Sequence, residues 1–220
     1  KMALRQADRL ICISSQTKKE VMESYKVPED KIVLVSQAIP GSFRPMPEVP
    51  KEGTVGYIGA LKKRKNVELL VHAFAIYSRR PGAAPLRLNI YGGGTDLPYL
   101  KALASELGVS DIVDFRGPIE EELLVKTYNS FSLFVLPSLQ EGFGFPIIEA
   151  QACGVPVLTL RGALIPEEVA RFTIKCSDEE DMAEQMDRLM KDKGLRERTI
   201  SDGIRHAAEF SIEEMGLRTR

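Results

Sequence analysis

Short apolar runs alternate with helical patterns along most of this chain, and this alternation constrains the fold more than any other feature of the sequence. Continuous apolar strands separated by amphipathic helices are typical of a parallel sheet that helices cover on both faces. We therefore predict an α/β fold with a doubly wound parallel sheet, in which ligands bind beyond the carboxyl ends of the strands. The runs are Val55–Ile58, Leu86–Tyr91, Ile112–Phe115, Leu133–Leu136, Val155–Leu160 and Phe172–Cys176.

The N-terminal part of the chain predicts a separate βαβ unit. Arg9–Ile13 and Ile32–Val35 are short β-like runs, and a helix reaching Tyr25 fits between them. The stretch Pro40–Pro50 holds four prolines with a glycine and a serine, a composition that resists regular structure. We interpret it as a linker, so that the βαβ unit belongs to a different domain from the residues that follow.

Composition and charge narrow the function classes. A net charge of −1 and a pI near 6.3 give no whole-chain reason to expect nucleic acid, so any basic site must be local. Cys12, Cys153 and Cys176 lie far apart without metal-ligand spacing, which favours unpaired thiols in a reducing compartment. The sequence has no apolar run long enough to span a bilayer and no signal peptide, and we expect a soluble piece of something longer.

The two histidines, His72 and His206, have no motif around them, and both are interpreted as structural.

The segment Leu136–Ala150 carries the strongest functional signal. It ends an apolar run, turns through Gly142 and Gly144, and opens a helix in whose first turn Pro146 fits. Glycines let a backbone approach a ligand closely, and a helix start offers unpaired N–H groups to an anion. The segment therefore predicts an anion-binding turn.

Two carboxylates, Glu141 and Glu149, flank that turn at a spacing of eight positions. Eight helical positions place side chains roughly 80° apart, and the glycine turn interrupts the helix as well. A glycosidase needs two facing carboxylates at a defined separation, which a turn followed by a helix does not guarantee. We expect the two carboxylates to contact different parts of one ligand.

A basic turn follows the first of the six runs. Gly59 ends the strand, Lys62, Lys63, Arg64 and Lys65 follow, and Asn66 is placed to cap the next helix. Positive charge and a helix N-terminus both favour phosphate. A solvated basic turn is the alternative interpretation.

Two further turns fall at strand ends. Tyr91–Asp96 contains Gly92, Gly93 and Gly94 before a helix that Thr95 is placed to cap, but it lacks the spacing of known phosphate loops, so a tight structural turn explains it equally well. Phe115–Pro118 could offer its backbone to a flat heterocycle or could be a simple turn.

Together these residues resemble the C-terminal, donor-binding domain of family 4 retaining glycosyltransferases, which have the GT-B fold. The resemblance extends from Ala7–Ser14, similar to the end of that family's N-terminal domain, to Phe210–Met215, similar to its closing helix. The Glu, seven residues, Glu signature followed by Ala150–Val157 is its most specific part.

The resemblance implies a division of the chain into four parts. Residues 1–39 would be a remnant of the N-terminal acceptor domain and 40–52 the interdomain linker. Residues 53–209 would form the Rossmann-like domain that binds the nucleotide-sugar donor, and 210–220 would begin the closing helix.

The resemblance also implies roles for site residues. Glu141 would face the donor sugar, Arg64 and Lys65 would bind the diphosphate, and these three would carry the catalysis. Many members have an arginine directly after the glycine that Gly59 matches, but Ala60 stands here, and Arg64 is the expected substitute. The remaining implied donor-binding residues are Gly59, Gly92, Gly93, Arg116, Gly117, Gly142, Phe143, Gly144, Phe145 and Glu149, the last at the ribose.

The implied activity is transfer of a hexose, of mannose or glucose type, from a nucleotide diphosphate sugar with retention of configuration. The base stays open among GDP, UDP and ADP, and the acceptor would be a glycan, a lipid or a small molecule. No cofactor or metal is expected, and no nucleic acid partner. The protein is expected in the cytoplasm, and a missing domain could attach it peripherally to the cytoplasmic membrane face.

Two other function classes remain open at this point. One is a nucleotide- or sugar-phosphate-binding module without transfer activity, and the other is a plain interaction domain. Because the acceptor domain is nearly absent, we expect these 220 residues alone to be inactive in transfer.

Overall fold

The structure is a computed structural model, and it describes residues 7–218. Its main body is a six-stranded sheet in which neighbouring strands pair in parallel, with the strand order β5-β4-β3-β6-β7-β8. The strands are β3 (Thr54–Ile58), β4 (Arg87–Tyr91), β5 (Val113–Gly117), β6 (Leu133–Leu136), β7 (Val157–Leu160) and β8 (Ile174–Cys176). This arrangement confirms the predicted α/β fold with a parallel, doubly wound sheet.

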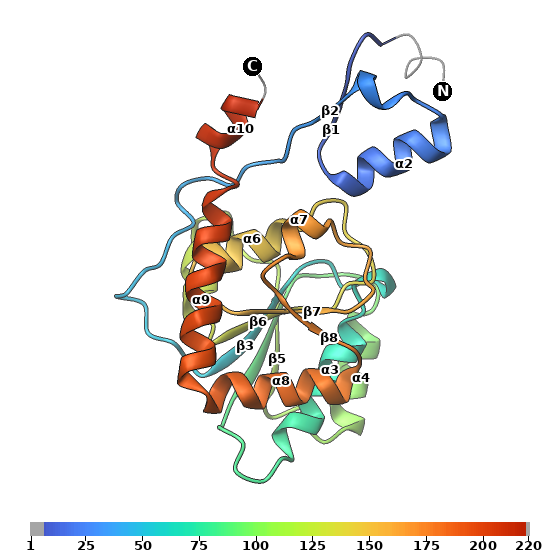
Figure 1. The fold of residues 1–220 in the computed structure, drawn as a ribbon. Coiled ribbons are helices and arrows are strands. Elements are labelled where there is room, and N and C mark those ends of the chain that lie inside the picture. The colour runs from blue at the N-terminus through green and yellow to red at the C-terminus, as the bar shows by residue number, and fades with distance from the viewer. Residues whose placement is uncertain (1–6, 219–220) are drawn as a thin grey trace.

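Helices cover both faces of the sheet (Figure 1). On one face α3 (Val67–Ser78) packs against α4 (Leu97–Glu106) and α8 (Glu179–Lys191). On the other, α6 (Phe145–Ala152) packs against α5 (Glu121–Ser130) and α9 (Lys193–Ala208). The shorter elements are the 3-10 helix η2 (Lys63–Lys65), α7 (Glu167–Ala170) and α10 (Ile212–Arg218).

The strand order reverses between β3 and β6. From β3 the chain builds outward through β4 and β5, then crosses back to β6 and builds outward on the other side through β7 and β8. In such sheets a crevice opens at the carboxyl ends of the two strands where the order reverses. The fold therefore predicts a ligand site at the turns that follow β3 and β6.

The N-terminal unit, which we define as residues 7–34, has its own small sheet. Strands β1 (Leu10–Cys12) and β2 (Ile32–Leu34) pair in parallel, and α2 (Ser15–Tyr25) and the 3-10 helix η1 (Glu29–Lys31) connect them. This confirms the predicted βαβ unit. Its buried residues Cys12, Val27 and Ile32 form a hydrophobic cluster separate from the main core.

All eight predicted strands are present, with ends within two residues of those expected. Residues 35–53 contain no helix or strand, as predicted for the linker, although the predicted domain limits themselves stay predictions. Residues 1–6 and 219–220 of the outermost predicted parts lie outside the described residues. The three cysteines are free, as expected, and all three are buried.

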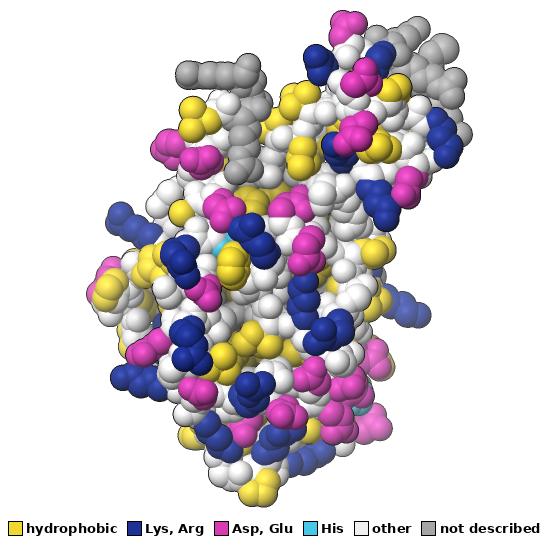
Figure 2. Space-filling model, in the orientation of Figure 1, with side chains coloured by type: hydrophobic (Ala, Val, Ile, Leu, Met, Phe, Trp, Pro, Cys, Tyr) yellow, Lys and Arg dark blue, Asp and Glu magenta, His cyan; other side chains and the backbone are white. Residues whose placement is uncertain are grey.

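The surface of the described residues agrees with the near-neutral charge. Figure 2 shows Lys and Arg side chains interspersed with Asp and Glu over the face viewed, so positive charge does not dominate that face. Among residues 7–218, no helix combines the length and apolar character needed to cross a membrane.

Close packing between β3 and the segment before β6 leads to a stability prediction. A Cβ built on Gly56 would lie 2.3 Å from ring atoms of Phe131, a buried residue that cannot move freely. Because overpacking a core costs on the order of 1–3 kcal/mol, Gly56→Ala should lower the free energy of unfolding by about 2 kcal/mol in urea titrations. Gly41→Ala, whose Cβ meets nothing within 4 Å, is the control. Equal stability of the two variants would contradict this packing.

Candidate functional site in the cleft at the strand ends

A buried ion pair spans the switch point of the sheet. Lys65, in the turn after β3, points its Nζ at both carboxylate oxygens of Glu141, in the turn after β6, at 2.6 and 2.8 Å. Lys65 is 9% exposed and Glu141 7%, so both charges are shielded from solvent. The structure thus brings together two predicted site residues that are 76 positions apart.

Backbone contacts hold the same two turns together. The amide of Leu139 donates to the carbonyl oxygen of Arg64 at 3.0 Å, and the Arg64 guanidinium reaches the carbonyl oxygen of Gln140 at 3.4 Å. Arg64 is exposed, unlike its neighbour Lys65. The predicted cationic pair therefore has one buried member held by Glu141 and one member at the surface.

The turn after β6 has the predicted shape. Gly144 has a φ of +106°, a conformation that favours glycine, and it immediately precedes α6 with Pro146 in the first turn. The Phe143 ring is buried and packs against Phe145, with ring centroids 5.0 Å apart, so the two rings anchor the turn. Within residues 7–218, the amides of Gly142, Phe143 and Phe145 donate no hydrogen bond. They come just before or at the first residue of α6, and an anion is favoured at such a helix start.

Glu149 has a different partner from Glu141. It lies within α6, half-buried, and accepts a hydrogen bond of 2.7 Å from the hydroxyl of Tyr128, a fully buried residue of α5. Burial raises the pKa of Glu149 above its ordinary value of 4.5, and the Tyr128 hydrogen bond opposes that rise. The two carboxylates have separate protein partners, and their contact with different parts of one ligand stays a prediction. Tyr128 is a supporting residue that the sequence did not reveal, because nothing local marks it.

Backbone hydrogen bonds connect the glycine turns at the ends of β3, β4 and β5. The Gly59 amide donates to the Tyr91 carbonyl oxygen at 3.0 Å, and the Gly92 amide donates to the Gly117 carbonyl oxygen at 2.7 Å. A Cβ on Gly92 would lie 1.9 Å from the Gly59 carbonyl oxygen. Close packing therefore explains Gly59 and Gly92, and their donor-binding role stays a prediction.

The other residues of these turns are more exposed. Gly93 is exposed and its carbonyl oxygen accepts from the Leu61 amide at 2.9 Å. Arg116 is exposed at the end of β5, and its side chain pairs with Asp114 at 3.3 Å. These residues lie at the carboxyl edge of the sheet, farther from the switch point than Lys65 and Glu141.

Two capping predictions need correction. Asn66 does precede α3, but in the left-handed conformation and without a hydrogen bond from its side chain to the helix. Asp96, not Thr95, is the residue before α4, and the Thr95 hydroxyl donates to the Asp96 carboxylate instead. In the turn before α4, Gly94 packs so closely on the Leu61 carbonyl that a Cβ would lie 2.0 Å from its oxygen, which restricts the backbone there.

The cleft has a second wall, contributed by the N-terminal unit. A cavity of about 670 Å³ lies between α2 and the loops after β6 and β7. Its lining includes Lys19 and Glu23 from α2, and Gln140 and Leu164 from the loops. Gln140 directly precedes Glu141, so the cavity lies beside the turn that carries the carboxylate of the ion pair. Within residues 7–218, no three side chains of His, Cys, Asp or Glu gather in a way that could hold a metal ion.

Nearly the whole chain is similar in sequence to known proteins. The family described as glycosyl transferases group 1 matches residues 42–206. A D-inositol 3-phosphate glycosyltransferase of Nocardia farcinica is 31% identical over 96% of this chain and 51% of the relative. O-antigen chain mannosyltransferase B of Escherichia coli is 28% identical over 99% of this chain and 60% of the relative. The chain spans about half the length of the curated relatives it matches.

Solved structures share the fold. The Anabaena protein HepE, in complex with UDP and glucose, has a TM-score of 0.83 at 17% identity, covering 99% of this chain and 63% of HepE. A sucrose-phosphate synthase of Thermosynechococcus elongatus has a TM-score of 0.83 at 24% identity, covering 99% of this chain and 58% of the synthase.

The buried ion pair predicts an unequal response to single and double substitution. Glu141→Ala leaves the Lys65 charge buried without its partner, which should cost about 3 kcal/mol in the free energy of unfolding. The double variant Lys65→Met, Glu141→Leu removes both charges and should recover most of that loss in the same urea titration. A Glu141→Ala variant as stable as the wild type would show that the pair is not shielded.

The raised pKa of Glu149 predicts a pH dependence of stability. The folded state holds this proton more tightly than the unfolded state does, so the contribution is fully present below pH 4.5 and is lost as pH rises through the raised pKa. The free energy of unfolding of the wild type, minus that of Glu149→Gln, should therefore fall from pH 4 to pH 7. A flat difference would contradict the burial of this carboxylate.

Proposed function

This chain belongs to the glycosyl transferases group 1 family, and on that premise we propose that it is the donor-binding half of a family 4 retaining hexosyltransferase. The observation that carries the proposal is the Lys65–Glu141 pair at the switch point between β3 and β6. It places a cation and a carboxylate in one shielded crevice, beside the free amides that precede α6. A ligand with a phosphate end and a hydroxyl-rich end matches that combination.

The donor would lie across the switch point with its diphosphate at the turn after β3 and its sugar at the turn after β6. Lys65, with Arg64 at the surface, offsets negative charge on the diphosphate as the bond to the sugar breaks, which stabilises the leaving group. Glu141 accepts hydrogen bonds from the sugar, and the turn from Gly142 to Phe145 supplies amide donors. Glu149, oriented by Tyr128, accepts from the ribose hydroxyls.

The proposed donor sugar is a hexose of mannose or glucose type. The Escherichia coli relative is named a mannosyltransferase, and HepE was crystallised with UDP and glucose, which supports this choice. The proposed acceptor is a glycan, a lipid or a small molecule, and the proposed site of action is the cytoplasm or its membrane face. Because the relatives are about twice as long, we expect these residues alone to bind donor without transferring sugar.

The first test is ligand binding by the chain itself. Thermal unfolding with GDP, UDP or ADP should show stabilisation by one of the three, since a ligand that binds only the folded state raises its stability. In the full-length protein, release of that diphosphate from its nucleotide sugar in the presence of acceptor would support transfer. Binding without any release across donors would instead support a non-catalytic nucleotide-binding module, and no stabilisation by any nucleotide would support an interaction domain.

Two substitutions test the phosphate end and the ribose end of the donor site separately. Lys65→Ala should weaken binding of the nucleoside diphosphate by about tenfold and leave the nucleoside nearly unchanged, because the lost contact is a charged one to phosphate. Glu149→Ala should weaken both, because both contain ribose. Isothermal titration calorimetry measures each affinity, and Lys101→Ala, an exposed lysine of α4, is the matched control. Equal losses for diphosphate and nucleoside in Lys65→Ala would contradict the phosphate assignment.

A further inference from the structure

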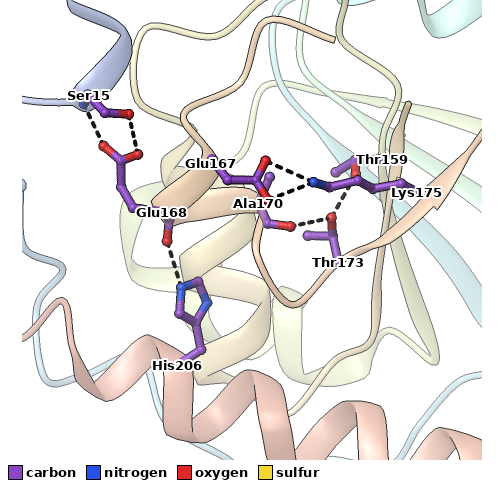
Figure 3. A network of polar contacts seen from close by, with 8 residues as sticks. All are labelled: Ser15, Thr159, Glu167, Glu168, Ala170, Thr173, Lys175 and His206. Carbon is purple, nitrogen blue, oxygen red and sulfur yellow. Dashed lines mark hydrogen bonds and ion pairs between the residues drawn. The ribbon is translucent and has the colours of Figure 1, made fainter. Parts of the chain in front are cut away.

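The N-terminal unit contacts the main body at the start of α2, through a carboxylate of α7. The Ser15 amide donates to Glu168 Oε1 at 2.7 Å, and the Ser15 hydroxyl donates to Oε2 at 2.5 Å (Figure 3). The two residues are 153 positions apart. One carboxylate thus accepts two hydrogen bonds from the first residue of a helix that belongs to the other unit.

The contact is well suited to fix the helix in place. Charge-assisted hydrogen bonds are stronger than neutral ones, and a carboxylate is favoured at the positive N-terminus of a helix. Ser14 already caps α2 from within, accepting from the Thr17 amide at 3.1 Å. Glu168 therefore adds an attachment to a helix that is complete without it, which indicates a role between the two units rather than within α2.

Glu168 is also held through its backbone carbonyl group. Its carbonyl oxygen lies 2.7 Å from His206 Nε2, so this nitrogen carries the hydrogen, since a carbonyl can only accept. The His206 ring is 1% exposed, and its Nδ1 lies 2.8 Å from the side chain of Gln151 in α6. Figure 3 shows the resulting line of contacts from Ser15 through Glu168 to His206 on α9. The backbone of Glu168 is therefore anchored to α9 and, through Gln151, to α6, two of the helices that cover this face of the sheet.

The contact between Ser15 and Glu168 places α2 against the turn after β6. The hydroxyl of Ser14, next to Ser15, lies 3.4 Å from the carbonyl oxygen of Gly142, a donor within reach of an acceptor. The cavity of about 670 Å³ between α2 and the loops after β6 and β7 begins beside this contact, with Ser15 in its lining. The buried cluster of the N-terminal unit is separate from the main core, but Ile13, directly before Ser14, packs against that core. The polar contacts of Ser14 and Ser15 add to this apolar contact and orient the start of α2 toward the turn.

We propose that Glu168 is a positioning residue, which seats α2 on the Glu141–Phe145 turn and thereby sets the width of the cavity lined by Gln140, the residue next to Glu141. Glu168 itself does not touch the donor. Its effect on transfer rests on the proposed function, because an acceptor must reach the donor through this cavity. The seating of α2 does not depend on that function and can be tested separately.

The first experiment measures the seating directly. Spin labels on Asp30→Cys, beside α2, and Lys101→Cys, on α4, report the distance between the two units by electron double resonance, and the native cysteines are buried. We expect a single narrow distribution for the otherwise unchanged protein and a broader, longer one for Glu168→Ala. Glu168→Gln, which keeps one accepting oxygen for the Ser15 amide, should lie between them. Identical distributions in all three would overturn the proposal.

Glu167→Ala is the matched control for that measurement. Glu167 is the neighbouring residue of α7, and its carboxylate pairs with Lys175 of the same unit at 2.9 Å (Figure 3). Its removal changes the charge of α7 equally but leaves the contact to Ser15 in place. The distance distribution should stay narrow, and broadening as large as in Glu168→Ala would overturn the specific role of Glu168.

The second experiment uses the full-length protein. Glu168→Ala should lower kcat for transfer by about tenfold, since two charge-assisted hydrogen bonds are lost, while the Kd of the nucleoside diphosphate and the KM of the donor stay unchanged. A variant that was only less stable would not lower kcat while leaving the Kd of the nucleoside diphosphate and the KM of the donor unchanged. An unchanged kcat with a broadened distance distribution would overturn the positioning role. If neither protein binds any nucleotide, the proposed function fails, and the distance measurement still decides the seating.

Discussion

The arrangement of the cleft depends on the buried ion pair between Lys65 and Glu141. It joins the turns after β3 and β6, the adjacent strands at which the order of the sheet reverses. Removing two charges from water is costly, so such a pair contributes little net stability, but losing either partner is strongly unfavourable. The pair therefore holds the two turns at one separation. The hydrogen bond from the Leu139 amide to the Arg64 carbonyl oxygen acts in the same direction.

Backbone packing forms the rest of that edge of the sheet. The turns after β3, β4 and β5 approach so closely that a Cβ on Gly92 or Gly94 would overlap a carbonyl oxygen of the turn after β3. The Gly59 and Gly92 amides donate to acceptors within the protein, whereas within residues 7–218 the amides of Gly142, Phe143 and Phe145, in the turn that carries Glu141, donate no hydrogen bond. Positive charge and amide donors thus meet at one point of the crevice, where they favour a phosphate group.

The opposite wall differs from this rigid edge in how it is attached. The main core runs through the six-stranded sheet and its helices, whereas the N-terminal unit has a separate cluster of three buried residues. Polar contacts of Ser14 with Gly142 and of Ser15 with Glu168 connect α2 to the site. Ile13 adds an apolar contact with the main core, so among the described residues the N-terminal unit is joined to the main body by one packed side chain and a few hydrogen bonds, a smaller attachment than the packing inside that core.

The sequence by itself determined the strands, the helices between them, the parallel sheet and the turns that carry the site. It could do so because apolar periodicity, glycine turns and helix starts are local properties of neighbouring residues. The tertiary structure alone decided that Lys65 pairs with Glu141, that Tyr128 holds Glu149 and that Glu168 receives Ser15. These partners are 76, 21 and 153 positions apart, and they meet only because the order of strands and helices brings their segments together. The glycine amides show the same limit, since whether an amide faces a ligand or a neighbouring turn depends on how closely the turns pack.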